Sequence, residues 1–103
     1  MMNAAKELLT FIENSPSMFH SIETIKGMLD EAGFTYLPER TCWDVKQGGT
    51  YYTIRNHSSI IAFRVGKELG DYHFQMCASH SDSPTYKIKN VPELNGPGEY
   101  LRL

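Results

Sequence analysis

The sequence lacks a long apolar run and lacks an excess of positive charge. Its apolar runs, such as residues 60–63, are far shorter than the roughly 20 residues that a membrane-spanning helix needs. Ten lysines and arginines against twelve aspartates and glutamates give a formal charge of -2, without a basic stripe. Nucleic-acid binding normally shows as clustered positive charge. These absences argue against membrane and nucleic-acid partners.

Cysteine is also scarce, and the chain is short. Cys42 and Cys77 are too few for a disulfide framework, which fits a reducing cytosol. The first residues show no basic region followed by an apolar one, as a secretory signal would. The 103 residues are 41% apolar and 12% aromatic, enough for a modest core and against disorder. We therefore expect a cytoplasmic protein in which residues 1–103 form a single unit.

Two helices are expected in the first third of the chain. Residues 3–14 carry apolar side chains at spacings of three and four, with Asn3 as a candidate cap. Ser15 and Pro16 interrupt this pattern and suit the start of a second helix there or a few residues later. Gly33 suits the left-handed conformation that commonly ends a helix.

After the second helix, β-branched and aromatic residues are grouped between turn residues, which predicts strands. Strands are expected at residues 51–55, 60–65, 72–79 and 86–89, with a loop at 94–99 and an unpartnered strand starting in 100–103. The short turns favour an antiparallel meander, because parallel neighbours need long crossovers. The fold class is therefore α/β (mixed), with two N-terminal helices followed by a largely antiparallel sheet.

The most informative segment is residues 77–84, where small polar residues surround His80 and Asp82 at the end of an apolar strand. In extended backbone, the period of two points His80 and Asp82 to the same side, where the carboxylate can orient the imidazole. Metal-binding histidines typically have such a partner. A polar turn whose His and Asp only cap the strand is the competing interpretation. His80 alone cannot make a catalytic zinc site, which needs about three protein ligands.

Other chemistries fit this segment less well. A serine hydrolase is disfavoured because the sequence has no G-x-S-x-G elbow. A structural zinc is disfavoured because Cys77 and His80 face opposite ways on a strand and Cys42 has no second cysteine nearby. Within an apolar strand, Cys77 is expected to be a buried, inert thiol. Weaker signals come from the other histidines, which lie at a helix start, in a turn and in a strand: His20, His57 and His73.

Several ordered blocks resemble the N-terminal segment of the M18 zinc aminopeptidases, the aspartyl aminopeptidase family. The blocks are residues 4–23, 32–34, the lone Trp43, residues 55–66 and residues 78–89. Ordered blocks with compatible gaps are more specific than one short motif. In that family the His of a His-Thr-Asp motif ligates zinc, so the resemblance implies that His80 is a zinc ligand and Asp82 its orienting partner. Ser81 stands where the family usually has Thr.

The resemblance also implies part of a larger α/β metallopeptidase catalytic domain. Two zinc ions would polarise the scissile carbonyl and lower the pKa of a bridging water towards about 7, and a Glu would take its proton. In the family, that Glu and the remaining ligands lie beyond residue 103, so the isolated chain is expected to be inactive. The implied substrate is a peptide with a free, in some members acidic, N-terminal residue. Members form homo-oligomers in which a neighbouring subunit completes the active centre, and His20 is a secondary candidate for that neighbourhood.

An interpretation from another class is a small non-catalytic α+β module that binds a protein partner through unpaired strand edges. Under that hypothesis, removal of His80 leaves function unchanged. A regulatory fragment that joins full-length oligomers is a third interpretation.

Overall fold

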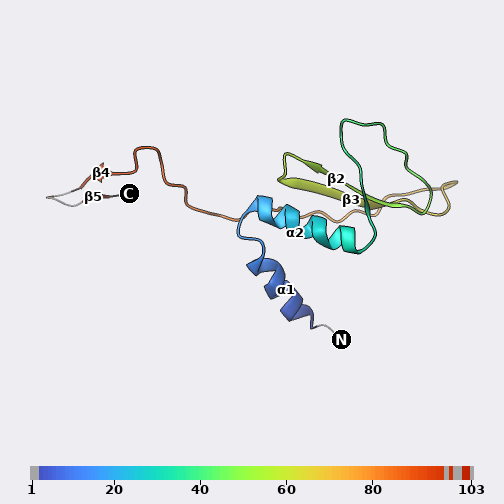
Figure 1. Cartoon of the computed structure of the whole chain (residues 1–103), viewed down its shortest axis with the longest axis horizontal. Helices are drawn as coiled ribbons and strands as arrows, with labels where there is room; N and C mark the ends of the chain where they lie inside the picture. Colours follow the sequence, from blue (N-terminus) through green and yellow to red (C-terminus); the bar gives the residue numbers. More distant parts are fainter. Residues whose placement is uncertain (1–2, 97, 99–100, 103) are drawn as a thin grey trace.

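The computed structural model describes residues 3–96, 98 and 101–102. Two helices come first in the chain, a three-stranded sheet follows, and a long extended segment leads to a small hairpin at the C-terminal end (Figure 1). The elements are α1 (Ala4–Glu13), α2 (Met18–Glu31), β1 (Thr35–Tyr36), β2 (Thr50–Arg55), β3 (Ser59–Arg64), β4 (Leu94–Asn95) and β5 (Leu101–Arg102).

Both helices are confirmed, and local capping explains their limits. The Asn3 side chain accepts a hydrogen bond from the backbone nitrogen of Ala5 at 3.0 Å and caps α1. Ser17 caps α2 in the same way, so this helix begins at Met18, a little after Pro16. Gly33 follows the end of α2 with a φ of 84°, in the left-handed region that a residue without a side chain adopts most easily.

The central hairpin is also confirmed. β2 and β3 pair antiparallel from Thr50↔Arg64 to Arg55↔Ser59. Their turn holds Asn56 and His57 at φ values of 52° and 55°, the positive values that tight hairpin turns with the twist of the strands require. The third strand of this sheet is β1, which pairs in parallel with β2 and was not predicted. Residues 37–49 supply the crossover of about a dozen residues that a parallel pair needs.

Ile22, Leu37, Tyr51 and Tyr52 are the buried apolar residues of the fold. Tyr52 faces α2, whereas Tyr51, one position earlier on β2, points to the other face of the sheet, where its ring centroid lies 5.6 Å from that of Phe63. The Tyr52 hydroxyl donates to Asp30 Oδ1 at 2.6 Å, and Lys26 Nζ donates to Asp30 Oδ2 at 3.1 Å. Burial raises the pKa of Tyr52, and the hydrogen bond from Tyr52 lowers the pKa of Asp30. This network attaches α2 to β2.

Two predicted strands are wrong. Residues 72–79 and 86–89 make no strand ladder. Phe74 and Met76 are 81% and 89% exposed, so no described residue covers the apolar face that the alternating pattern predicted. An extended segment without a paired edge or a covering layer gains little from that pattern. For the same reason Cys77, predicted to be buried, is exposed and free.

The C-terminal end corrects another prediction. Leu94 and Asn95, assigned to a loop, form β4 and pair antiparallel with β5. The strand expected at the end of the chain therefore has a partner. Composition identifies turn residues but no pairing partner, and the pairing with Leu101 and Arg102 makes Leu94 and Asn95 a strand. Within the two predicted segments, Pro97, Glu99, Tyr100 and Leu103 lie outside the described residues.

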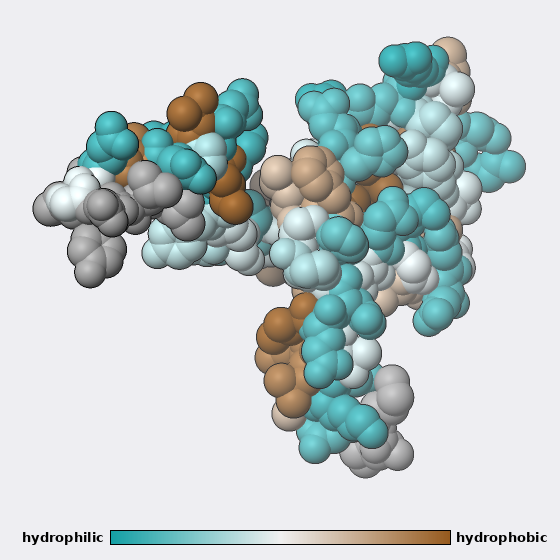
Figure 2. Space-filling model, turned by 60° about the vertical axis from the view of Figure 1, so that its left-hand side comes forward, coloured by the Kyte–Doolittle hydropathy of each residue, from teal (hydrophilic) through white to brown (hydrophobic). Residues whose placement is uncertain are grey.

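The chain as a whole is elongated. Its radius of gyration is 20.4 Å, whereas a compact chain of this length has about 13 Å. α1 extends away from the sheet (Figure 1), and Leu8, Leu9 and Ile12 on it are more than half exposed. A brown apolar patch marks this helix in Figure 2. Within the described part of the chain, neither helix combines the length and hydropathy of a membrane span.

Candidate metal-binding site

The structure brings His80 and Asp82 into contact. His80 Nδ1 donates to the backbone carbonyl oxygen of Asp82 at 2.8 Å and lies 3.2 Å from Asp82 Oδ1. A carbonyl oxygen can only accept, so Nδ1 carries the proton and the neutral ring keeps its lone pair on Nε2. Both side chains are exposed, at 81% and 72%. An imidazole with Nδ1 held by a neighbouring residue and Nε2 available has the geometry that metal-binding histidines typically show.

A second contact attaches this segment to the sheet. Ser81 Oγ donates to the backbone carbonyl oxygen of Ser58 at 3.0 Å. Ser58 lies in the turn between β2 and β3, 23 positions earlier in the chain. The sequence analysis missed this contact because no local pattern predicts a hydrogen bond over such a separation.

His80 and Asp82 line a groove of about 590 Å³. The N-terminal helices contribute Phe11 and Ile22 to its wall, and β3 contributes Ile60. The wall thus combines apolar side chains from two layers with the polar residues of the extended segment. Binding sites of enzymes commonly have this mixture of an apolar wall and a few placed polar groups.

The positions of the His, Cys, Asp and Glu side chains show how many metal ligands the described residues offer at one place. Across residues 3–96, 98 and 101–102, no group of three or more His, Cys, Asp or Glu side chains is placed to hold a metal ion. The available Nε2 of His80, with Nδ1 held by Asp82, fits a single ligand position. The residues present therefore fit zinc as one ligand and its partner, and a catalytic zinc site would need further ligands besides them.

The other three histidines have different surroundings. His20 Nδ1 lies 2.7 Å from the hydroxyl of the cap residue Ser17. His57 lies in the β2–β3 turn, and His73 is exposed on the extended segment. Within the part of the chain that the structure describes, none of them lines the His80 groove.

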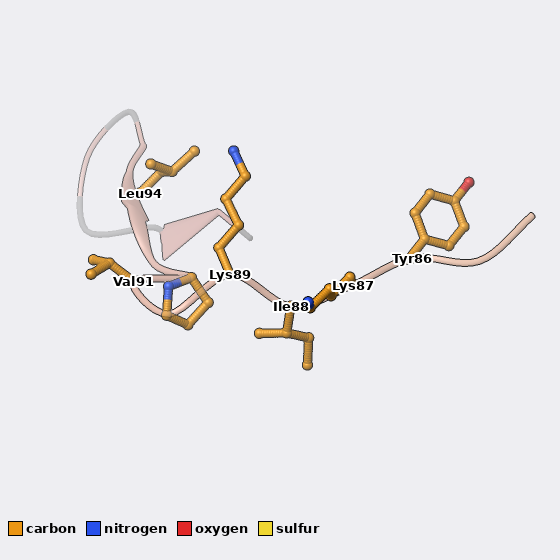
Figure 3. A pocket seen from close by; sticks show the side chains of 7 residues that line it. Tyr86, Lys87, Ile88, Lys89, Val91 and Leu94 are labelled. Carbon is orange, nitrogen blue, oxygen red and sulfur yellow. The ribbon is translucent and has the colours of Figure 1, made fainter. Parts of the chain in front are cut away.

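A second concave surface lies near β4 and has other chemistry. It encloses about 440 Å³ along residues 86–94 and is mainly apolar. Figure 3 shows Lys89 and Ile88 leaving opposite sides of the extended chain. Tyr86 and Ile88 are 105% and 75% exposed. No acid or histidine lines this surface, so it offers no ligand for a metal.

The known proteins that are similar to this chain belong to one family. A family model described as aminopeptidase I zinc metalloprotease (M18) matches residues 11–102. The probable M18 family aminopeptidase 2 of Clostridium novyi is 42% identical over 100 residues, which are 96% of this chain and 23% of the relative. The protein of the same description from Clostridium acetobutylicum is 41% identical over 100 residues, with the same two shares, 96% and 23%. The chain thus spans 23% of the length of these curated relatives.

Two solved structures of related proteins are similar to this chain in sequence and in fold. The mApe1 of Chaetomium thermophilum is 43% identical with a TM-score of 0.58, over 59% of this chain and 14% of that one. The mApe1 dodecamer of S. cerevisiae is 35% identical with a TM-score of 0.58, over 63% of this chain and 16% of that one. The two helices and mixed sheet are those of an α/β fragment of such chains. Because the family model covers residues 11–102, this chain belongs to the M18 family of zinc metalloproteases.

Proposed function

We propose that residues 1–103 form one unit, the N-terminal portion of a zinc-dependent aminopeptidase catalytic domain that removes N-terminal residues from peptides. The observation that carries this proposal is the His80–Asp82 pair, with Nδ1 donating at 2.8 Å and Nε2 available. Membership of the M18 family and the names of the curated relatives support the reaction class.

In this proposal His80 is a zinc ligand through Nε2, and Asp82 is its orienting partner. Asp82 holds the proton on Nδ1 through its carbonyl oxygen and its carboxylate, at 2.8 and 3.2 Å. Two bound zinc ions would supply Lewis-acid polarisation of the peptide carbonyl and a water of lowered pKa. The orienting contact would raise the basicity of the imidazole and fix its direction.

Substrate, assembly and location are further parts of the proposal. The substrate is a peptide with a free N-terminus, with acidic first residues preferred. The working form is a homo-oligomer, which the dodecameric mApe1 supports by similarity. The free thiols of Cys42 and Cys77 support a reducing compartment, the cytoplasm.

The test uses the full-length protein, its zinc content and the hydrolysis of aspartyl and leucyl peptides. H80A should lose zinc and turnover, because a ligand is removed. D82A removes the carboxylate acceptor at 3.2 Å and keeps the carbonyl acceptor at 2.8 Å, so it should lose about 10-fold in metal affinity or turnover, the lower end of the range for outer partners of ligands. H73A is the matched control, because His73 is exposed and outside the groove. Zinc binding and turnover that survive H80A would refute the proposal.

The isolated 103-residue chain should be inactive with added zinc, because the described residues offer a single ligand position. Its rate should match that of the H80A chain under the same conditions. Turnover in the isolated chain that H80A abolishes would contradict this part of the proposal.

A further inference from the structure

Ser81 differs from its neighbours in burial. Among residues 66–91, all of them described, Ser81 alone is half-buried and every other residue is exposed. It lies between the two residues of the His80–Asp82 pair, and its side chain contacts the sheet rather than that pair. A polar residue that is shielded within an otherwise exposed segment marks a point of attachment.

The attachment is to a well-defined part of the fold. Ser81 Oγ donates to the carbonyl oxygen of Ser58 at 3.0 Å. The Ser58 backbone nitrogen donates to the carbonyl oxygen of Arg55 at 3.2 Å, which closes the turn between β2 and β3. The six-residue β2–β3 ladder continues directly from this turn. The acceptor for Ser81 is therefore held by the sheet.

No other hydrogen bond between described residues joins residues 72–91 to the rest of the chain. The His80–Asp82 contact spans only two positions. It can orient the imidazole within its own segment, but it cannot place that segment relative to the groove. The Ser81–Ser58 hydrogen bond supplies the long-range constraint that the local pair lacks.

We propose that Ser81 is a positioning residue of the zinc site, acting through its hydrogen bond to the Ser58 carbonyl oxygen to place His80 on the groove wall. This inference rests on the proposed role of His80 as a zinc ligand. Ser81 itself touches neither metal nor substrate. Because the acceptor is a backbone carbonyl, any residue 81 that keeps a hydroxyl donor can serve, including threonine.

The experiment measures the zinc dissociation constant of the full-length protein by competition with a chelator, for the wild type, S81A, S81T, T85A and H80A. S81A should bind zinc about 10–100-fold more weakly, the range typical of residues that support a ligand. S81T should restore binding, because it returns the hydroxyl. T85A is the matched control, since Thr85 is exposed, lies outside the groove and makes no hydrogen bond with the described residues. The visible absorption of the cobalt-substituted protein should shift in S81A and should match that of the wild type in S81T and in the control variant.

The outcomes separate the two claims. If S81A binds zinc as the wild type does while H80A does not, the positioning role falls and the ligand role stands. If H80A binds zinc as the wild type does, both claims fall. S81T that behaves like S81A would also overturn the inference, because the hydroxyl would then not explain the effect. If S81A does not fold, S81C replaces it in the comparison. A thiol is a weaker hydrogen-bond donor than a hydroxyl, so S81C should bind zinc more weakly than the wild type, with a smaller loss than that expected of S81A.

Discussion

The backbone carbonyl of Asp82 decides which nitrogen of His80 carries the proton and leaves Nε2 with its lone pair. It accepts from Nδ1 at 2.8 Å, while the carboxylate lies at 3.2 Å from the same nitrogen. Two acceptors on one residue hold the ring more firmly than one. The spacing of two residues was readable in the sequence, because extended backbone places every second side chain on one side. The contact between Ser81 and Ser58 was not readable, because it depends on where the hairpin turn lies in space.

The hydrogen bonds that Asp30 accepts from Tyr52 and Lys26 give a prediction about proton binding by Asp30. The Tyr52 hydroxyl donates to Asp30 at 2.6 Å and lowers the pKa of that carboxyl below its ordinary value of 3.8. Y52F removes this donor, so the pKa of Asp30 should rise towards 3.8. NMR titration of the Asp30 carboxyl carbon measures the change. Y51F is the control, because the Tyr51 hydroxyl accepts from the Lys46 backbone nitrogen and does not contact Asp30.

The sign of the linked stability follows from the lowered pKa. The folded chain binds a proton at Asp30 less readily than the unfolded chain, so this contribution is present above the unfolded pKa and is lost as pH falls through the folded one. Tyr52, whose pKa burial raises, contributes below its ordinary 10.0 and loses that contribution at higher pH. An Asp30 pKa unchanged by Y52F would contradict the assignment of the hydrogen bond.

At the scale of elements, two glycines of the α2 region should respond in opposite ways to the same substitution. Gly27 lies within α2 with open space around an added side chain, so G27A should stabilise the chain by about 0.5–1 kcal/mol. Gly33 has a φ of 84°, which disfavours any side chain, so G33A should cost about 1–2 kcal/mol. Urea unfolding followed by circular dichroism measures both. Equal effects of the two variants would contradict the left-handed helix end.

Elements with local signals were predicted and elements that depend on distant partners were not. α1 and the end of α2 have caps and a glycine in the sequence, and the β2–β3 hairpin has turn residues between two apolar runs. β1 consists of two residues whose pairing depends on a crossover rather than on a pattern. Residues 72–79 have the alternation of a strand, but alternation specifies a face and not a partner.

At the scale of the whole molecule, exposed apolar side chains accompany the elongated shape. Leu9 on α1, Met76 and Ile88 are 60%, 89% and 75% exposed. Burial of such side chains would gain roughly 1.5–3 kcal/mol each, but the described residues leave them exposed. The distribution fits the proposal that this chain packs within a larger catalytic domain.

This shape can be measured directly. Small-angle X-ray scattering of the 103-residue chain should give a radius of gyration near the 20.4 Å of the structure. The reason is that residues 72–91 have a single hydrogen-bonded attachment among the described residues. A value of about 13 Å, typical of a compact chain of this length, would show that the exposed apolar segments collapse onto the sheet.

The most direct test of the central claim is a crystal structure of the full-length protein with zinc, using anomalous scattering at the zinc edge. The account predicts a zinc ion at about 2.0–2.1 Å from His80 Nε2, with Nδ1 still held by Asp82. Zinc bound elsewhere, with the His80 imidazole outside its coordination sphere, would contradict it.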